Sequence, residues 1–178
     1  MRKPIAYAAG PLGFSEAGRL FHNNVLIPIL KEIGFEVLDP WILTPQKTID
    51  SALTLPYGQE KKKKWQEVNQ VIGKNNTLAI EASDIIVAVL DGVDVDSGTA
   101  GEIGYGSALG KFIIGYRGDF RLSSDNEGSI VNLQIEYFIF KNGGEIVTSL
   151  ESLKVSLVKF MDSFNKVHII ANSDGSIT

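Results

Sequence analysis

The chain has 178 residues, of which 21% are charged and 44% hydrophobic, with a formal net charge of −4 and no cysteine. This length predicts a single domain over residues 1–178 with room for a good core. The slight acidity argues against nucleic acid as a main partner, and the lack of cysteine excludes disulfide and thiolate chemistry. No apolar run nears the roughly 18 residues of a membrane span, and Met1–Pro4 is too short for a secretory signal. We therefore expect a cytoplasmic protein with no membrane partner.

The first third of the chain predicts a strand, a helix, a second strand and a long loop. Ser15 is a good N-cap for the helix, and Gly34 is a good end for it. The boundaries we expect are a strand over 5–9, a helix over 16–33, a strand over 35–38 and a loop over 40–58. A loop of that length in a compact domain is often functional.

The remainder alternates helices and strands. The predicted order is a helix over 60–82 interrupted near 73–76, a strand over 84–90, a helix from 102, a strand over 111–116, a polar loop over 117–128, a helix over 129–140, a strand over 145–147 and a helix over 150–164. The tail over about 166–178 is expected to be loosely packed, with 168–171 a strand or packed coil. Lys61–Lys64 indicates a solvated helix face rather than a phosphate-binding patch.

Strands that alternate with helices indicate a mostly parallel sheet with right-handed crossovers. The fold class we predict is α/β: a flavodoxin-like three-layer sandwich with a five-stranded, mostly parallel sheet.

The most informative stretch is Asp96–Glu102, which follows the apolar run Ile85–Leu90 and opens a helical pattern. It predicts a strand, an acidic glycine-rich loop and a helix start, at the sheet edge where open α/β folds build their sites. Backbone N–H groups at a helix start stabilise a nearby anion. A carboxylate kept ionised and directed into a cleft can act as a nucleophile.

Two other strand ends reach the same edge: the first brings Tyr7 and Gly10, and the second brings Asp39. Tyr7 is either a core aromatic or a phenol that hydrogen-bonds and orients a carboxylate. Gly10 either lets a ligand approach the backbone closely or belongs to a plain turn. The spacing after Gly10 is neither that of a phosphate-binding Walker loop nor that of a dinucleotide fingerprint. His22 lies in the first predicted helix, where we expect a structural role.

Asp91, Asp94, Asp96 and Glu102 form an acidic patch with three interpretations. Mg²⁺ and Ca²⁺ favour clustered carboxylates, although the spacing of a calcium loop is not present. A purely solvated loop is the second interpretation. The one we favour pairs two carboxylates as nucleophile and proton donor, which needs neither a metal nor a cofactor.

Seven short segments occur in an order that resembles the nucleoside 2-deoxyribosyltransferase family. They are Tyr7–Leu12, Ile80–Asp84, Leu90–Gly92, Asp96–Tyr105, Gly110–Lys111, Gly115–Arg117 and Val131–Leu133. The resemblance covers roughly residues 4–147 and implies the same flavodoxin-like fold. It also implies transfer of 2-deoxyribose between nucleobases by double displacement, as in nucleotide salvage, with 2′-deoxynucleosides and free nucleobases as partners and no cofactor.

The resemblance also assigns roles to individual residues. Glu102 matches the family nucleophile, which forms a deoxyribosyl ester, and Tyr7 matches the tyrosine that positions it. Asp96 matches the acid that contacts and helps to protonate the base. Asn132 matches an asparagine donated across a subunit interface to the sugar, which implies at least a homodimer. Asn76 stands where some members place a second base-contacting aspartate, which leaves the accepted bases open.

Three further residues are candidates for substrate binding: Gly10, Asp91 and Trp41. For Trp41, stacking on a base and simple packing are both open. One rival function is an N-glycosidase that hydrolyses 2′-deoxynucleosides or their 5′-monophosphates, for which a phosphate pocket is conceivable from Arg19, Arg117, Arg121, Ser123 and Ser124. A second rival is a non-enzymatic nucleotide-sensing module, since fold alone does not decide function.

Overall fold

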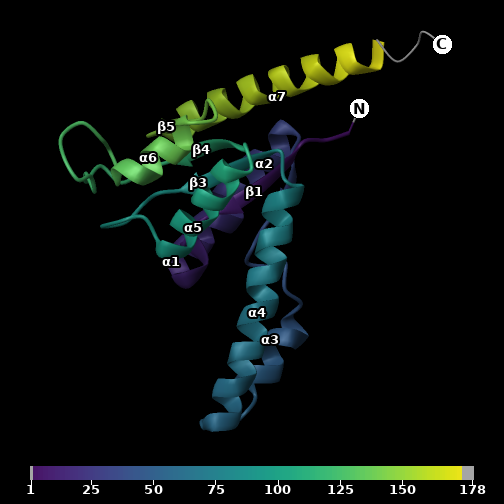
Figure 1. The fold of residues 1–178 in the computed structure, drawn as a ribbon, viewed down its shortest axis with the longest axis vertical. Helices are drawn as coiled ribbons and strands as arrows, with labels where there is room; N and C mark the ends of the chain where they lie inside the picture. The colour runs from purple at the N-terminus through teal and green to yellow at the C-terminus, as the bar shows by residue number, and fades with distance from the viewer. Residues whose placement is uncertain (1, 174–178) are drawn as a thin grey trace.

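Five short strands lie side by side in the order β2-β1-β3-β4-β5, and every neighbouring pair is parallel. The computed structural model describes residues 2–173 (Figure 1). The strands are β1 (Ile5–Ala9), β2 (Glu36–Leu38), β3 (Ile85–Val89), β4 (Phe112–Tyr116) and β5 (Glu145–Val147). This strand order is that of flavodoxin-like folds, and the predicted α/β class is confirmed.

Helices cover both faces of the sheet and complete three layers (Figure 1). One face packs against a continuous helical stretch and the last helix: α1 (Glu16–Phe21), the π-helix η2 (His22–Leu26), α2 (Ile27–Ile33) and α7 (Leu150–Ser173). The other face packs against α4 (Gln59–Ala82), α5 (Ser97–Ala108) and α6 (Leu133–Phe140). Two short helices, η1 (Leu12–Phe14) and α3 (Gln46–Leu53), lie in the connections that follow β1 and β2.

The central strand β3 is buried along its whole length because helices cover both of its faces. Ile85 and Val87 contribute to the core beside α2 and α7, while Ile86 and Ala88 contribute to the core beside α4, α5 and α6. Full burial of an Ile or Val side chain stabilises a fold by about 2 kcal/mol. Two apolar layers thus fix the sheet, and with it the loops that follow each strand.

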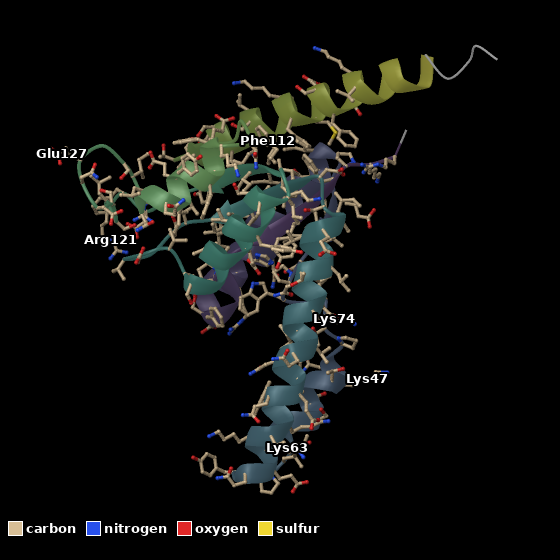
Figure 2. All side chains as sticks on the ribbon, viewed as in Figure 1. Lys47, Lys63, Lys74, Phe112, Arg121 and Glu127 are labelled. Atoms are coloured by element: carbon tan, nitrogen blue, oxygen red, sulfur yellow. The ribbon has the colours of Figure 1, made fainter. Side chains whose placement is uncertain are left out.

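The helix α3 and the first half of α4 extend beyond the sheet as an arm, which we define as residues 46–72 (Figure 1). Lys47 and Lys63 lie on the arm and, like Lys74 farther along α4, are exposed to solvent (Figure 2). Lys61 instead donates to the carbonyls of Leu53 and Leu55 at the end of α3. The interpretation of the lysine run as a largely solvated helix face therefore agrees with the structure.

Several predicted boundaries are wrong. The loop expected over 40–58 contains α3, which begins directly after Pro45. Helix α4 runs without interruption through Gly73. The helix expected from 129 begins at Leu133, and the last helix continues to Ser173, so residues 168–171 are helical rather than a strand or coil. The rest of the predicted tail, residues 174–178, lies outside the described residues.

Candidate active site

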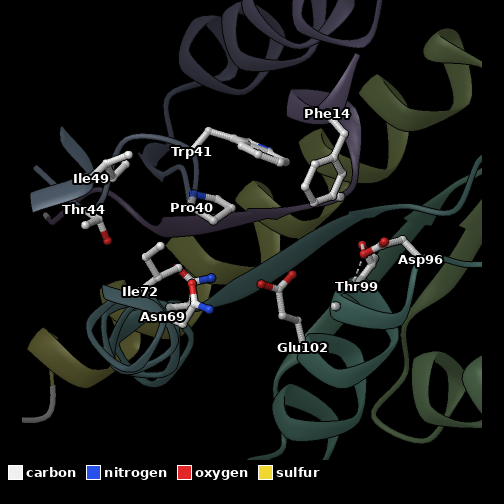
Figure 3. A pocket seen from close by; sticks show the side chains of 13 residues that line it. Phe14, Pro40, Trp41, Thr44, Ile49, Asn69, Ile72, Asp96, Thr99 and Glu102 are labelled. Atoms are coloured by element: carbon white, nitrogen blue, oxygen red, sulfur yellow. Dashed lines mark hydrogen bonds between the residues drawn. The ribbon is translucent and has the colours of Figure 1, made fainter. Parts of the chain in front are cut away.

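A cavity of about 420 Å³ opens at the carboxyl edge of the sheet. Loops after β1 and β2 form one side, α4 forms another, and the N-terminal turns of α5 form the third (Figure 3). This is the edge at which open α/β sheets place their ligands, because the crossovers leave a crevice there. Its lining combines apolar and aromatic side chains with a few polar groups, as is typical of small-molecule sites.

The centre of the cavity holds the carboxylate of Glu102, from the second turn of α5 (Figure 3). The hydroxyl of Tyr7, which is fully buried in β1, donates a hydrogen bond of 2.6 Å to Oε1 of Glu102. Burial and the charge of Glu102 raise the pKa of Tyr7, so the phenol stays a neutral donor at any working pH. Tyr7 is therefore both a core aromatic and the group that orients the carboxylate.

Burial raises the pKa of Glu102, and the nearby charge of Asp96 adds to this shift against the opposing hydrogen bond from Tyr7. This shift opposes ionisation, so the stabilisation expected from the helix start does not dominate at Glu102. The N-terminal N–H groups of α5 are reached by Asp96 instead, whose Oδ2 accepts from the Thr99 N–H at 3.0 Å and from its hydroxyl at 3.2 Å. Asp96 is thus the N-cap of α5, and it also lines the cavity.

One wall of the cavity is aromatic, and the wall opposite it is mostly polar. Trp41 and Phe14 meet edge to face with their ring centroids 4.8 Å apart, on the side of the β1 and β2 loops (Figure 3). Opposite them, Asn69, Ile72 and Asn76 come from successive turns of α4 and all line the cavity. The Oδ1 atom of Asn76 is buried without a hydrogen-bond partner in the protein. An unpaired amide beside a cavity is available to a ligand.

The structure gathers most of the predicted site residues at this cavity. Its lining includes Gly10, Trp41, Asn76, Asp96 and Glu102, and Tyr7 contacts it through Glu102.

Two predicted residues do not line the cavity in the single chain. Asp91 accepts a hydrogen bond of 2.9 Å from the Asp119 N–H, so it fastens the loop after β3 to the loop after β4. Asn132 is the N-cap of α6, where its Oδ1 accepts from the Gln134 N–H at 3.0 Å. Neither residue is part of the cavity wall.

Sequence reasoning missed several lining residues, among them Phe14, Ile49, Asn69 and Ile72. The spacing of residues 69, 72 and 76 places them on one face of a helix. The prediction of Asn76 as a site residue therefore held a signal for the other two. Phe14 and Ile49 had no comparable signal, because η1 and α3 were expected to be loops.

The acidic patch disperses in the fold. Asp94 accepts from the Val95 N–H next to it at 2.7 Å, Asp91 accepts from the Asp119 N–H in the loop after β4, and Asp96 accepts from Thr99 in α5. Within residues 2–173, no three His, Cys, Asp or Glu side chains gather in a group that could hold a metal ion.

The arginines of the conceivable phosphate pocket are engaged elsewhere. Arg117 is fully buried and donates to the carbonyls of Leu90, Gly92 and Arg121. Arg121 forms an ion pair with Asp119, and Arg19 donates to the Gly13 carbonyl at 3.0 Å. None of these arginines lines the cavity.

No helix within the described residues is long and apolar enough to cross a membrane.

Solved structures share this fold. A conserved protein from Enterococcus faecalis V583 is 23% identical with a TM-score of 0.63, over 89% of this chain and 99% of that one. A 2-desoxiribosyltransferase from Leishmania mexicana is 24% identical with a TM-score of 0.58, over 88% and 97%. A CMP N-glycosidase from Clostridium botulinum is 19% identical with a TM-score of 0.50, over 89% and 98%. At these identities the likeness concerns the fold alone.

No curated protein matches the chain. A family model does, and it spans the strands and loops that build the cavity: the model of nucleoside 2-deoxyribosyltransferases matches residues 6–134. The chain therefore belongs to the nucleoside 2-deoxyribosyltransferase family.

Proposed function

We propose that the protein transfers 2-deoxyribose from a 2′-deoxynucleoside to a free nucleobase through a covalent intermediate on Glu102. The observation that carries this proposal is a carboxylate at the centre of a cavity, held by one oxygen through the 2.6 Å hydrogen bond from Tyr7. The other oxygen is left to attack, because Tyr7 fixes the rotation of the carboxylate. Such a group can act as a nucleophile at an anomeric carbon.

The first step is a nucleophilic displacement at C1′. An electron pair of Glu102 forms the bond to C1′, the C1′–N bond breaks, and its electron pair passes to the leaving base. Asp96, which lines the same cavity, gives this base a proton, so the reactive form pairs a protonated Asp96 with an ionised Glu102. In the second step a nitrogen of another base attacks C1′, Glu102 leaves as a carboxylate, and the proton returns to Asp96. The products are a new nucleoside and an unchanged enzyme.

The 2-deoxy sugar suits this route. It lacks the electron-withdrawing 2′-hydroxyl group, so positive charge at the anomeric centre costs less in the transition state. On this proposal, the negative charge of Glu102, oriented by the hydroxyl of Tyr7, stabilises that positive charge. Preorganised charge of this kind is the usual source of large rate gains.

Hydrolysis is the alternative, in which water takes the place of the second base. It retains the same first step, and the fold is shared with a CMP N-glycosidase. The engagement of Arg117 and Arg121 with carbonyls and with Asp119 supports a free nucleoside over a monophosphate, because those cations are not available to a 5′-phosphate at the cavity. Transfer remains the function we propose.

The proposed active unit is at least a homodimer. Leu133, Tyr137 and Phe140 form an exposed apolar stripe on α6, with 51%, 58% and 48% of their surface accessible. Stripes of this kind mark interaction sites. Asn132 lies at the start of the same helix. We expect a second copy seated on this stripe to bring Asn132 close to the partner's cavity, as the family resemblance implies.

Product analysis tests the proposal. The protein is incubated with deoxyinosine and adenine, and the products are separated. We expect hypoxanthine and deoxyadenosine in equal amounts. With deoxyinosine alone, intact-protein mass spectrometry should show one added deoxyribosyl group, which Glu102→Ala removes. Free deoxyribose without deoxyadenosine would identify a hydrolase, and no turnover of any deoxynucleoside would refute both reactions.

Subunit complementation tests the assembly. Glu102→Ala and Asn132→Ala variants are purified inactive and then mixed. A mixed dimer contains one site with both native residues if Asn132 crosses the interface, so activity should return to roughly a quarter of the wild-type level. No recovery, with subunit exchange verified, would place Asn132 and Glu102 in the same chain's site.

A further inference from the structure

The first helical stretch contains a histidine buried against a carboxylate. His22 Nε2 and Asp39 Oδ2 are 2.9 Å apart, and the two residues are only 4% and 6% exposed. Buried polar groups of this kind are retained only when they are hydrogen-bonded, because desolvation is costly. The pair lies outside the proposed reaction steps, so its presence needs another explanation.

The backbone at His22 is also unusual. The stretch His22–Leu26 forms a π-helix, in which the Ile27 N–H donates to the His22 carbonyl five residues earlier. Such wide turns are rare and are frequently associated with functional sites. Here the wide turn sits at the residue that reaches Asp39, at the end of β2.

The second oxygen of Asp39 continues the connection to the cavity. Its Oδ1 accepts from the Trp41 N–H at 3.0 Å, while the Asp39 carbonyl accepts from the N–H groups of Ile42 and Leu43. An aspartate that caps its own turn in this way fixes the turn geometry. One carboxylate therefore joins the buried His22 to the backbone of Trp41.

The indole of Trp41 is positioned by close contacts on its other side. A Cβ atom added at Gly13 would lie 2.1 Å from the Trp41 ring, so the ring lies directly on the Gly13 backbone. Phe14 meets the same ring edge to face, and both aromatic residues line the cavity (Figure 3). Aromatic walls of this kind stack on flat ligands.

We propose that the His22–Asp39 pair is a positioning element that holds the Trp41 wall of the cavity and thereby sets the affinity for the base, without taking part in chemistry at Glu102. This inference rests on the proposed function for its ligand, a nucleobase. It assigns His22 a role in recognition, beyond the structural one expected from its helix.

Tryptophan fluorescence tests this directly, because Trp65 is the only other tryptophan in the chain. In a Trp65→Phe background, Trp41 is the sole reporter. His22→Leu removes the hydrogen bond to Asp39, whereas His22→Gln keeps an N–H donor. We expect Leu to shift the Trp41 emission to longer wavelength and to weaken quenching by adenine roughly fivefold, and Gln to restore both. In the transfer assay KM should rise by a similar factor, with kcat changed less than about twofold.

A matched control separates positioning from loss of stability. Asp84→Asn weakens the pair of Arg2 and Asp84 at the opposite end of the sheet and should leave Trp41 emission and KM unchanged. If His22→Leu does not fold, Asp39→Ser replaces it, since serine can accept from the Trp41 N–H but is too short to reach His22.

Two outcomes overturn the inference: a folded His22→Leu protein with native emission, adenine affinity and KM, or a Gln variant that behaves like Leu despite a native circular dichroism spectrum. Failure of the proposed function is distinguishable, because absence of turnover in the wild-type protein leaves the emission comparison intact.

Discussion

The sheet body and the arm contribute different kinds of group to one cavity. The body supplies ionisable side chains at strand ends and helix starts: Tyr7, Asp96 and Glu102. The arm and the turn that follows it on α4 supply uncharged ones, namely Ile49, Asn69, Ile72 and Asn76. On the proposed function, the chemistry belongs to the sheet body, while the arm and the Trp41 wall contribute to recognition of the base. Substitutions in the two regions should change different kinetic constants.

The most severe way to test this division is Glu102→Ala. Removing the attacking atom should lower the transfer rate by at least about a thousandfold, with the fold intact. The rate of deoxyadenosine formation from deoxyinosine and adenine measures the loss. Turnover at the wild-type rate would show that the body does not carry the chemistry through this residue.

Asp96 has two roles that a pair of variants separates. Asp96→Asn keeps an oxygen for the N-cap of α5 but removes the proton donor, so the rate of base release should fall roughly a hundredfold without loss of stability. Asp96→Ala should lose the rate and also about 1 kcal/mol of unfolding free energy. Thermal or urea unfolding beside the kinetic assay distinguishes them. Equal stability of both variants would contradict the capping role.

Tyr7→Phe should have a smaller effect than either, because it removes orientation and not the attacking atom. Loss of one hydrogen bond to a charged group corresponds to roughly a tenfold decrease in kcat. The measurement is kcat under saturating donor and acceptor. A decrease as large as that of Glu102→Ala would make the phenol a participant in the chemistry.

The arm should change binding. Asn69→Leu removes a polar group that lines the cavity and should raise KM for the base about threefold with kcat unchanged. Gln70→Leu, one position along the same helix and exposed outside the cavity, is the matched control and should leave KM as it is. A change in kcat from Asn69→Leu would show that arm and body are not separable.

The smallest effect concerns stability. Because the pKa of Glu102 is raised in the folded protein, the unfolded chain loses its proton first as pH rises from about 4.3, so ionisation of Glu102 lowers folding stability through that window. Glu102→Gln should therefore be more stable than wild type near pH 7 and equal to it in acid. Urea unfolding at both pH values checks this. The activity of the wild type should likewise fall, as pH decreases, at a pH above the ordinary glutamate range.

The same division explains what sequence could predict. The body follows strong local patterns. The structure confirms the strand predicted from the apolar run Ile85–Val89 and the helix ends predicted from Ser15 and Gly34. Glu102 was recognisable because it follows β3 at the sheet edge, and Tyr7 because it lies in β1 just before the same edge.

The arm lacks such patterns. Pro45 and Pro56 suggest a loop, yet Pro45 is compatible with a helix that begins at the next residue. Gly73 suggests a break in α4, and its cost of about 1 kcal/mol is outweighed by contacts on either side, including the hydrogen bond from Asn75 to the Thr44 hydroxyl. That bond joins residues 31 positions apart, which no local pattern encodes.

The buried guanidinium of Arg117 has a practical consequence for redesign. It donates only to main-chain carbonyls, those of Leu90 and Gly92 after β3 and that of Arg121 after β4. It therefore joins the two loops that follow these strands. A carbonyl is offered by every amino acid, so the side chains at positions 90, 92 and 121 can change without loss of these hydrogen bonds, whereas Arg117 cannot. A redesign of either loop should therefore leave Arg117 in place and preserve the backbone that it contacts.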